Sequence, residues 1–495
     1  MYNASTVTIA GNYIGTDTTG LTDLGNLRDG VLASETTNST IGGSVAVQSN
    51  LISGNSGSGI NFILSANNQI LNNVIGLNAT STAAIRNDNR GIWLRNNSNN
   101  ATIHGNRIAG NYHGIWFDFT SDSKITGNII GLASDGVTTI ANTGYGVAIS
   151  QTSFRNRIGT DGDGTNDVGE RNVVSGNTGY NIYVANNDDT IIAGNYVGLA
   201  VNGTDAVSGA PNAVGVYVVS TTRTVIGTNS STDPNNAAER NYISGHLSDG
   251  VQIVASNDTV LAGNVVGLST TGAILRNQGN GVTLSGATLR TRIGSNLDGS
   301  YDSIELNVIS ANNLSGIELT GPGPADVVIA GNYIGTGLNG SVDNGNKQRG
   351  VFLSQASNTT VRNNIISGND YSGIDAASST GTKIQGNAIG LDASGASPLA
   401  NSIHGIEIRG GSGNIVGTDG NGTNDAHEGN VISGNSQYGI FVTTNASNTR
   451  ISGNKIGTNQ TGSAAIGNLQ EGIRIGASTG TLIGSDGNGT SDTLE

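Results

Sequence analysis

The 495-residue chain contains no cysteine, one methionine and 5 prolines. Without cysteine it can form neither a disulfide bond nor a metal site built from thiolates. No apolar run approaches the roughly 20 residues that a membrane-spanning helix needs, and we recognise no signal peptide at the start of the chain. Aromatic residues make up only 4% of the composition, so a place where they gather is informative.

The chain also has little positive charge: 22 Lys and Arg against 36 Asp and Glu give a net charge of −14. An acidic balance disfavours nucleic acid and anionic membranes as partners, and it favours cations. The histidines are few and scattered, and we find no Ser-His-Asp set, no metal-binding histidine cluster and no phosphate-binding loop. The histidines are His104, His113, His246, His404 and His427.

Glycine is abundant, at 77 residues, and much of it lies in a short motif that recurs along the chain. One copy reads Asn430-Val-Ile-Ser-Gly-Asn435, and a shorter form reads Gly11-Asn12-Tyr13-Ile14-Gly15. The regular recurrence of Ile and Val argues against a disordered low-complexity chain. The asparagine that opens each copy marks the repeat, at Asn12, Asn50, Asn73, Asn106, Asn128, Asn172, Asn195, Asn241, Asn264, Asn307, Asn332, Asn364, Asn387, Asn430 and Asn454.

Successive markers are separated by 22–25 or by 32–46 residues, and the shorter spacing is the bare repeat. The repeat that begins at Asn430 holds three short apolar segments, Val431-Ile432, Gly439–Val442 and Thr449–Ile451. Three short strands in so few residues suit one coil in which each strand pairs with its equivalent in the next coil. A helix is disfavoured because no 3.6-residue stripe persists and glycine recurs throughout. We predict an all-β fold, a right-handed single-stranded parallel β-helix of about fifteen coils.

The longer repeats contain the same coil with added loops, which we expect to project on one edge of the solenoid, where such folds often do their work. Glycine and asparagine suit the corners of the coil, because both tolerate positive φ. Stacked asparagine side chains can also hydrogen-bond from coil to coil, so we interpret the marker asparagines as structural.

Both ends of the chain fall within a repeat and lack an atypical capping unit. We therefore expect residues 1–495 to form one β-helix domain that is a segment of a longer solenoid without its native caps. Uncapped strands can also pair with another chain, so end-to-end self-association into a fibre is an alternative.

These repeats and loops such as Ile158-Gly-Thr-Asp-Gly-Asp-Gly-Thr-Asn-Asp167 resemble the right-handed parallel β-helix repeats of large bacterial secreted and cell-surface proteins, in the pectate-lyase-like superfamily. The resemblance covers essentially the whole chain and implies the fold and a secreted or cell-surface location. That superfamily includes pectate-lyase-like enzymes, polygalacturonases, alginate epimerases, phage tailspikes and adhesins without catalytic role. The resemblance therefore implies no single activity.

Acidic loops are the first candidate sites. Oxygen ligands at alternate positions of a glycine-containing loop suit Ca²⁺, which would stiffen the loop. The spacing differs from the twelve-residue helix-loop-helix site and from the Gly-Gly-x-Gly-x-Asp nonapeptide, and a solvated turn is the alternative interpretation. The candidate ligands are Asp161, Asp163, Asp167 and Glu170, then Asp419, Asn421, Asp425 and Glu428, with a third copy at Asp486, Asn488, Asp492 and Glu495 and a looser one at Asn296, Asp298, Asp302 and Glu305.

The second candidate is a column of side chains on the second strand, where the residue between the two aliphatics of Gly-Ile-x-Ile points outward. Both tryptophans, Trp93 and Trp116, fall in this column on successive coils, and Tyr183 and Tyr217 follow. Two residues farther on, Arg95 and Asp118 should face each other as an opposite-charge pair. We predict that these side chains bind a sugar chain by stacking; mutual stabilisation of neighbouring strands is the alternative.

The expected function is an extracellular structural or adhesion module that binds polysaccharide or cell-surface glycan. The alternative is a polysaccharide-processing enzyme of the lyase, glycoside hydrolase or epimerase type, which requires carboxylates or basic groups that converge around residues 73–128. The epimerase-type motif Asp-Pro-His-Asp is absent, and we assign no catalytic residue.

Overall fold

The computed structural model describes residues 1–209, 213–228 and 236–485. The chain forms two compact units: unit 1 comprises residues 1–251 and 269–275, and unit 2 comprises residues 252–268 and 276–495. In each unit every coil contributes one short strand to each of three parallel sheets, which we number by the order of the strands after the marker asparagine. The predicted parallel β-helix is therefore confirmed.

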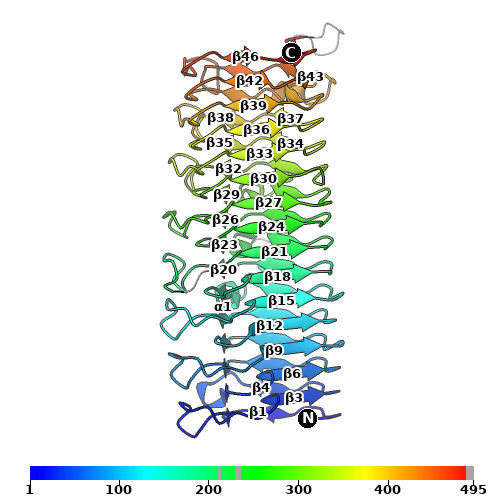
Figure 1. The fold of residues 1–495 in the computed structure, drawn as a ribbon, viewed down its shortest axis with the longest axis vertical. Coiled ribbons are helices and arrows are strands. Elements are labelled where there is room, and N and C mark those ends of the chain that lie inside the picture. Colours follow the sequence, from blue (N-terminus) through cyan, green and yellow to red (C-terminus); the bar gives the residue numbers. More distant parts are fainter. Residues whose placement is uncertain (210–212, 229–235, 486–495) are drawn as a thin grey trace. The chain divides into compact units, whose positions relative to one another are not determined.

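The strands of unit 1 are two to six residues long, and Figure 1 shows the sheet 2 arrows from β3 to β21 one above the next. Sheet 1 is β2 (Tyr13–Ile14), β5 (Leu51–Ile52), β8 (Val74–Ile75), β11 (Arg107–Ile108), β14 (Ile129–Ile130), β17 (Val173–Val174), β20 (Tyr196–Val197) and β23 (Tyr242–Ile243). Sheet 2 is β3 (Val31–Ser34), β6 (Ile60–Ile63), β9 (Arg90–Arg95), β12 (His113–Asp118), β15 (Val147–Ser150), β18 (Ile182–Ala185) and β21 (Val216–Val219). Sheet 3 is β1 (Thr8–Ile9), β4 (Thr40–Gly42), β7 (Gln69–Leu71), β10 (Thr102–His104), β13 (Lys124–Thr126), β16 (Arg157–Gly159), β19 (Ile191–Ala193) and β22 (Val225–Gly227).

Unit 2 repeats this arrangement. Its sheet 1 is β26 (Val265–Val266), β29 (Val308–Ile309), β32 (Tyr333–Ile334), β35 (Ile365–Ile366), β38 (Ala388–Ile389), β41 (Val431–Ile432) and β45 (Lys455–Ile456). Its sheet 2 is β24 (Val251–Val254), β27 (Val282–Ser285), β30 (Ile317–Thr320), β33 (Val351–Ser354), β36 (Ile374–Ala377), β39 (Ile406–Arg409), β42 (Ile440–Thr443) and β46 (Ile473–Ile475). Its sheet 3 is β25 (Val260–Ala262), β28 (Arg292–Gly294), β31 (Val328–Ala330), β34 (Thr360–Arg362), β37 (Lys383–Gln385), β40 (Ile415–Gly417), β44 (Arg450–Ser452) and β48 (Leu482–Ile483). One further pair joins β43 (Ala446–Ser447) to β47 (Ser478–Thr479).

The helices are single turns in the loops: η1 (Ala46–Gln48), α1 (Asp167–Glu170), η2 (Asn236–Glu239), α2 (Asp302–Glu305) and η3 (Asp425–His427). None of the helices in the described ranges is long and apolar enough to cross a membrane.

The core consists of aliphatic columns in register. Ile92 lies opposite Ile115, and Ile115 lies opposite Val147, all fully buried. Because the strands alternate, the residues between them face outward, as the sequence predicts. Each buried Ile or Val side chain contributes about 1.5–3 kcal/mol, so the stacked columns supply most of the stability of each unit.

The marker asparagines form a hydrogen-bonded ladder in each unit, and all are buried except the exposed Asn12 and the half-buried Asn454. The side-chain amide of Asn128 donates to Asn172 at 3.0 Å, and that of Asn172 donates to Asn195 at 2.9 Å. A second ladder runs through the other asparagine of the motif, as in Asn369 to Asn401 and Asn401 to Asn435, both 2.9 Å. The predicted asparagine stacking is confirmed. None of the markers, all within the described ranges, has positive φ; the preceding glycine takes that role, as at Gly11 with φ of 72°.

Loops that follow sheet 1 cover its outer face. In unit 1, Leu132, Val173, Tyr196 and Leu199 form a buried cluster beneath them. The serine of the Asn-x-Ile-Ser-Gly-Asn motif holds the next loop, because the Ser175 hydroxyl donates to the Leu199 carbonyl at 2.6 Å. At this edge the loops therefore enclose a second small core.

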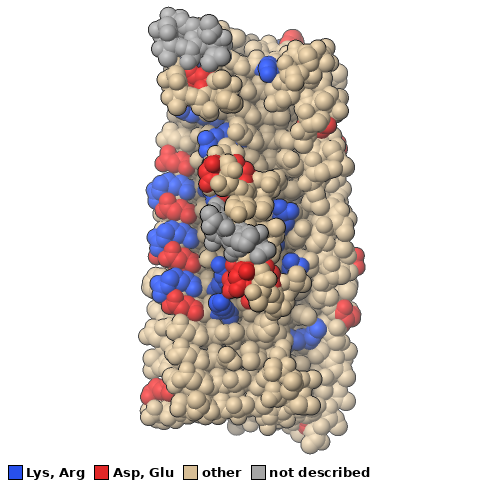
Figure 2. Space-filling model, turned by 180° about the vertical axis from the view of Figure 1, so that it is seen from behind, with Lys and Arg blue, Asp and Glu red and all other residues tan. Residues whose placement is uncertain are grey.

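A column of opposite charges marks the corner between sheets 2 and 3. In unit 1 the Arg155 guanidinium binds Asp122 through two hydrogen bonds of 2.7 and 2.8 Å, and Arg223 binds Asp189 in the same way. In unit 2, Arg290 binds Asp258. Figure 2 shows alternating red and blue side chains along this corner. Such exposed pairs favour correct stacking but contribute little stability.

Candidate functional site

The six predicted ligand-binding residues lie on the outer face of sheet 2 in unit 1. In the register of the sheet, Trp93 faces Trp116, Arg95 faces Asp118, and Tyr183 faces Tyr217. All six side chains are half-buried. The outward column predicted from the sequence is therefore present, and it is partly open to solvent.

Asp118 binds the two tryptophans. Its carboxylate accepts hydrogen bonds from the indole N–H groups of Trp93 at 3.0 Å and Trp116 at 2.7 Å, and from the Ser150 hydroxyl at 2.6 Å. The predicted ion pair between Arg95 and Asp118 is absent: among the described residues Arg95 makes no salt bridge within 4.0 Å, and its guanidinium lies 4.0 Å from the centre of the Trp93 ring. The two indole N–H groups are bound to the carboxylate instead.

Arg90 is a further residue of this site, which lies beside the predicted column but was not included in the predicted ligand set. Its guanidinium lies 4.1 Å from the centre of the Trp93 ring and 4.7 Å from that of Trp116. Burial lowers the pKa of Arg90; the charge of Asp118 opposes this, and that of Arg95 adds to it. An arginine remains protonated despite such a shift, so the two tryptophans hold two positive charges over their rings.

Two further tyrosines complete the array. Tyr145 stacks on Tyr183 with ring centres 4.8 Å apart, and Tyr180 stacks on Tyr217 at 4.5 Å. The Trp116 and Tyr145 rings are also nearly parallel, at 5.8 Å. We call Trp93, Trp116, Tyr145, Tyr180, Tyr183 and Tyr217 the aromatic face.

The missed residues share one position in the repeat. Arg90, His113, Tyr145 and Tyr180 each precede the outward strand residue by three. The turn into sheet 2 brings that residue beside the outward column. An aromatic or basic residue at this repeat position was therefore the sequence signal by which these side chains could have been found.

His113 is a packing residue. Its ring lies 4.3 Å from Tyr112, 4.5 Å from Trp116 and 5.1 Å from Tyr145, measured between ring centres. Its Nδ1 accepts a hydrogen bond from the Tyr145 backbone N–H at 2.9 Å. Burial, aided by the charge of Arg90, lowers its pKa to about 4, so it is neutral at pH 7.

The stacking decides what the aromatic face offers to a ligand. From Trp116 to Tyr217 each ring lies nearly parallel to its stacked neighbours, so the ring faces contact each other and the ring edges remain for solvent. Burial raises the pKa values of Tyr145, Tyr183 and Tyr217, so their hydroxyls stay neutral donors and acceptors. The chemistry available is therefore hydrogen bonding by phenol groups and guanidinium groups, not stacking on open ring faces.

Unit 2 carries a related cluster on its own sheet 2 with the opposite pairing. Asp375 is fully buried and accepts hydrogen bonds from Arg349 at 2.6 Å and from Arg409 at 2.9 and 2.6 Å. Arg409 also lies 3.6 Å from Glu407, whose pKa is raised by burial and then by the charge of Asp375. The arginines of this cluster are neutralised inside the protein.

The acidic loops bring part of each predicted set together. The carboxylate oxygens of Asp161, Asp163 and Asp167 lie within 4.8 Å of one another, as do those of Asp419, Asp425 and Glu428. The third copy, at Asp486, Asn488, Asp492 and Glu495, lies outside the described residues.

These carboxylates also organise the loops themselves. The Glu170 carboxylate accepts the backbone N–H of Asp161 at 3.1 Å, and Glu428 accepts that of Asp419 at 3.0 Å. The side chain of Asn421 accepts the Thr423 N–H at 2.7 Å, which closes a tight turn. The looser copy repeats the pattern, since Glu305 accepts the Asn296 N–H at 2.9 Å.

A lysine from the preceding coil contacts each aspartate that opens a loop. Lys124 lies 3.2 Å from Asp161, and Lys383 lies 2.8 Å from Asp419. Where the loop begins with Asn296 instead, the equivalent residue is Val260. The aspartate and lysine therefore occur together, and a metal ion would have to displace the lysine.

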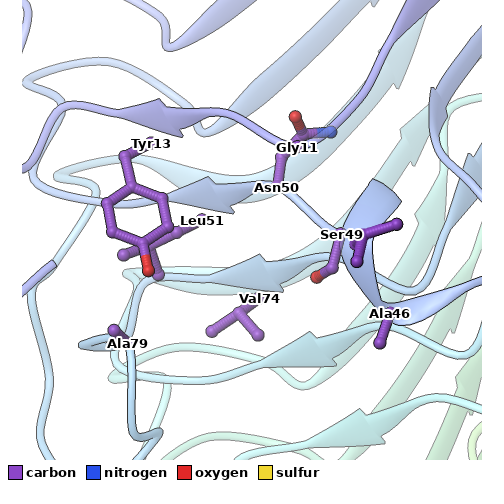
Figure 3. Close-up of a pocket in the computed structure, with 9 residues that line it drawn as sticks. Gly11, Tyr13, Ala46, Ser49, Asn50, Leu51, Val74 and Ala79 are labelled. Carbon is purple, nitrogen blue, oxygen red and sulfur yellow. The ribbon is translucent and has the colours of Figure 1, made fainter. Parts of the chain in front are cut away.

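A hollow of about 290 Å³ lies outside sheet 1 near β2, β5 and β8 (Figure 3). Tyr13, Leu51 and Val74 line one side, and Ala46 and Ser49 line the other. No Asp, Glu, His, Lys or Arg side chain lines it, and its hydroxyl-bearing residues are Tyr13 and Ser49.

The family models agree with this architecture. Residues 271–479 match the model described as a right-handed β-helix region. The chain is a right-handed parallel β-helix protein. No curated protein sequence is significantly similar to it.

Residues 1–142 of the β-helix match the model of NosD, described as a periplasmic copper-binding protein. Among the matched residues, all of which the structure describes, no three His, Cys, Asp or Glu side chains lie close enough together to share a metal ion. Of their two histidines, His113 is held by Tyr145, and His104 Nδ1 lies 3.0 Å from the Thr126 hydroxyl. No cluster of histidines occurs in the described part of the chain.

Several solved structures resemble the β-helix at low identity. The periplasmic alginate epimerase AlgG matches 90% of this chain and 73% of its own, with 13% identity and a TM-score of 0.32. The AlgE6 A-module, a mannuronan C-5 epimerase of Azotobacter vinelandii, matches 84% of this chain and 90% of its own, with 13% identity and a TM-score of 0.32. The Dettilon tailspike protein matches 82% of this chain and 62% of its own, with 15% identity and a TM-score of 0.36. We take no residue assignment from these similarities.

Proposed function

We propose that this β-helix is a structural and adhesion module outside the cytoplasm that binds polysaccharide along the aromatic face of unit 1. The observation that carries the proposal is the gathering of six aromatic side chains, five of them stacked in series, in a chain with only 4% aromatic residues. The periplasmic description of the family model that matches residues 1–142 agrees with this location.

The mode of binding follows from the geometry. Phenol hydroxyls repeat from coil to coil, at a spacing of about 4.8 Å between neighbouring strands. A polymer with many hydroxyl groups can form a series of individually weak hydrogen bonds with such a row, and their combined effect gives useful affinity. The stacked rings hold the hydroxyls in place, which reduces the entropy lost on binding.

The enzyme alternative requires converging carboxylates or basic groups, and Arg90, Arg95 and Asp118 do lie together on this face. The Asp118 carboxylate already accepts three hydrogen bonds, and His113 is buried with Nδ1 occupied. Neither group is placed to exchange a proton with a bound sugar. Self-association into a fibre has no specific observation in its favour.

The test is isothermal titration calorimetry with dextran, xylan and polygalacturonate, comparing the wild type with the double variant Tyr183→Phe/Tyr217→Phe. The variant keeps the stacked rings and loses two hydroxyls, so we expect about tenfold weaker binding with an unchanged melting temperature. Tyr371→Phe, at an exposed tyrosine of unit 2, is the matched control and should bind as the wild type does. Absence of binding to every polymer would overturn the proposal, and unchanged affinity in the double variant would show that the hydroxyls are not the contacts.

A further inference from the structure

On sheet 2, aspartate and arginine side chains bind each other in unit 2 but not in unit 1. In unit 2 the carboxylate of Asp375 neutralises Arg349 and Arg409 directly. In unit 1 the nearby acid is Asp118, two positions farther along its strand than Asp375, and it accepts hydrogen bonds from the two indoles and from Ser150 instead. Arg90 and Arg95, which lie over the rings of these tryptophans, are therefore left without a carboxylate partner.

Arg95 shows this most clearly. In the described part of the chain its guanidinium makes no hydrogen bond and no salt bridge, and its Nε atom is buried without a partner. Its one contact of note is the cation–π contact with Trp93 at 4.0 Å. A guanidinium carries five N–H donors, so nearly all of its hydrogen-bonding capacity is unused.

Arg90 adds a second positive charge beside it. Its side chain makes one hydrogen bond, from Nη1 to the Asn89 side-chain oxygen at 2.8 Å, and its Nε is also buried without a partner. Within the described residues no salt bridge involves Arg90. The rings of Trp93 and Trp116 hold the two guanidinium groups close enough for their charges to interact.

We infer that Arg90 and Arg95 form an oxyanion subsite at the tryptophan end of the aromatic face, where they bind the carboxylate or sulfate groups of an acidic polymer. The inference rests on the proposed function, since it names the chemistry of the ligand that the same face takes. The two guanidinium charges lie close enough to disfavour each other, and a bound anion would relieve this repulsion. A planar oxyanion matches the fork of a guanidinium, and a charge-assisted hydrogen bond is stronger than one to a neutral hydroxyl.

Asp118 acts here as a positioning residue. By holding both indoles it fixes the rings on which the guanidinium groups lie, and it remains too far from either arginine for a salt bridge. The ligand's oxyanion would complete the charge balance that Asp375 supplies within unit 2.

Intrinsic fluorescence tests the subsite directly, because Trp93 and Trp116 are the only tryptophans in the protein. The wild type is titrated with polygalacturonate as the carboxylate source, dextran sulfate as the sulfate source, sodium sulfate alone, and dextran as the neutral polymer. We expect the titrations of tryptophan emission to give dissociation constants at least tenfold lower for the two acidic polymers than for dextran. This preference should weaken as NaCl is raised. The acidic polymer that binds more tightly identifies the preferred oxyanion as carboxylate or sulfate.

Matched variants separate the subsite from the rest of the face. Arg95→Gln should lower affinity for the preferred acidic polymer about tenfold and leave dextran binding unchanged, while Arg95→Lys should retain part of the preference. Arg155→Gln removes another arginine of unit 1, one that Asp122 neutralises, and should leave all affinities unchanged. Circular dichroism melting of each variant establishes that it is folded.

The inference fails if dextran and the acidic polymers bind equally, or if Arg95→Gln keeps the preference for the acidic polymer. Either result leaves the proposed function intact as long as dextran or xylan binds. If no polymer binds but sodium sulfate still changes the emission of the wild type and not of Arg95→Gln, the subsite stands and the proposed function fails.

Discussion

Trp116 donates its indole N–H to the carboxylate of Asp118 at 2.7 Å, two residues farther along the same strand. The second oxygen of that carboxylate accepts the indole of Trp93 from the preceding coil. One acid therefore orients both tryptophans of the protein, and the arrangement of the whole charged end of the aromatic face depends on it.

Asp118→Asn should disturb this end without unfolding the chain. An amide group presents an N–H donor where one indole N–H also points, so one indole loses its acceptor. We expect a loss of about 1–3 kcal/mol in the free energy of unfolding, together with a shift of the tryptophan emission maximum. Chemical denaturation followed by fluorescence measures both quantities. Asp122→Asn, at an exposed acid of the same unit, should leave the emission maximum unchanged, and an equal shift in both variants would contradict the assignment.

The asparagine ladder predicts a larger effect inside the fold. Asn128 is fully buried; its amide donates to Ile103, Thr126 and Asn172, and its oxygen accepts from Asn106. Asn128→Ala leaves several of these groups without partners, so we expect a loss of about 3 kcal/mol or more. Asn202→Ala, at an exposed loop asparagine, should cost little by the same denaturation assay. Similar losses for the two variants would mean that the ladder does not stabilise the fold.

His113 predicts a pH dependence of stability. The pKa of His113 is about 4 in the folded chain against the ordinary histidine value of 6.5, so between these pH values the unfolded chain binds the proton and the folded chain does not. The stabilisation is therefore complete above pH 6.5 and is lost as the pH falls toward 4, by roughly 3 kcal/mol in total. Denaturation curves from pH 7.5 to 4.5 should show a steeper loss for the wild type than for His113→Gln. If the stability of the two proteins falls equally with pH, burial does not lower the pKa of His113.

Calcium binding at the acidic loops remains a prediction, and the structure adds a condition to it. Lys124 already supplies a positive charge to Asp161, so Ca²⁺ must compete with the lysine. Lys124→Ala should therefore be stabilised by CaCl₂ more than the wild type, as measured by the shift in melting temperature against a chelator control. If Ca²⁺ shifts neither protein, the carboxylates serve only the loop backbone.

The fold was predictable because one period governs the whole chain. The segments Val431-Ile432 and Gly439–Val442 appear as β41 and β42 within a residue of the predicted bounds. Alternation alone places Trp93 and Trp116 outward on successive coils. The stacking of marker asparagines also follows from the repeat, since equivalent residues of successive coils must be neighbours.

The pairing on the aromatic face was not predictable in the same way. Spacing puts Arg95 opposite Asp118, but it does not decide which of several donors the carboxylate accepts. The indoles take it because their N–H groups already point along the face, and the guanidinium groups then settle on the rings. Tyr145 and Tyr180 join the array through the bend before sheet 2, which a strand pattern does not describe.

Hydroxyl-radical footprinting with the tightest-binding polymer of the panel tests the central claim most directly, since aromatic side chains react readily and report their own exposure. The account predicts that saturating polymer protects Tyr145, Tyr180, Tyr183 and Tyr217 and leaves the exposed Tyr371 of unit 2 unprotected. Protection elsewhere on the chain, with these four tyrosines unchanged, would contradict it.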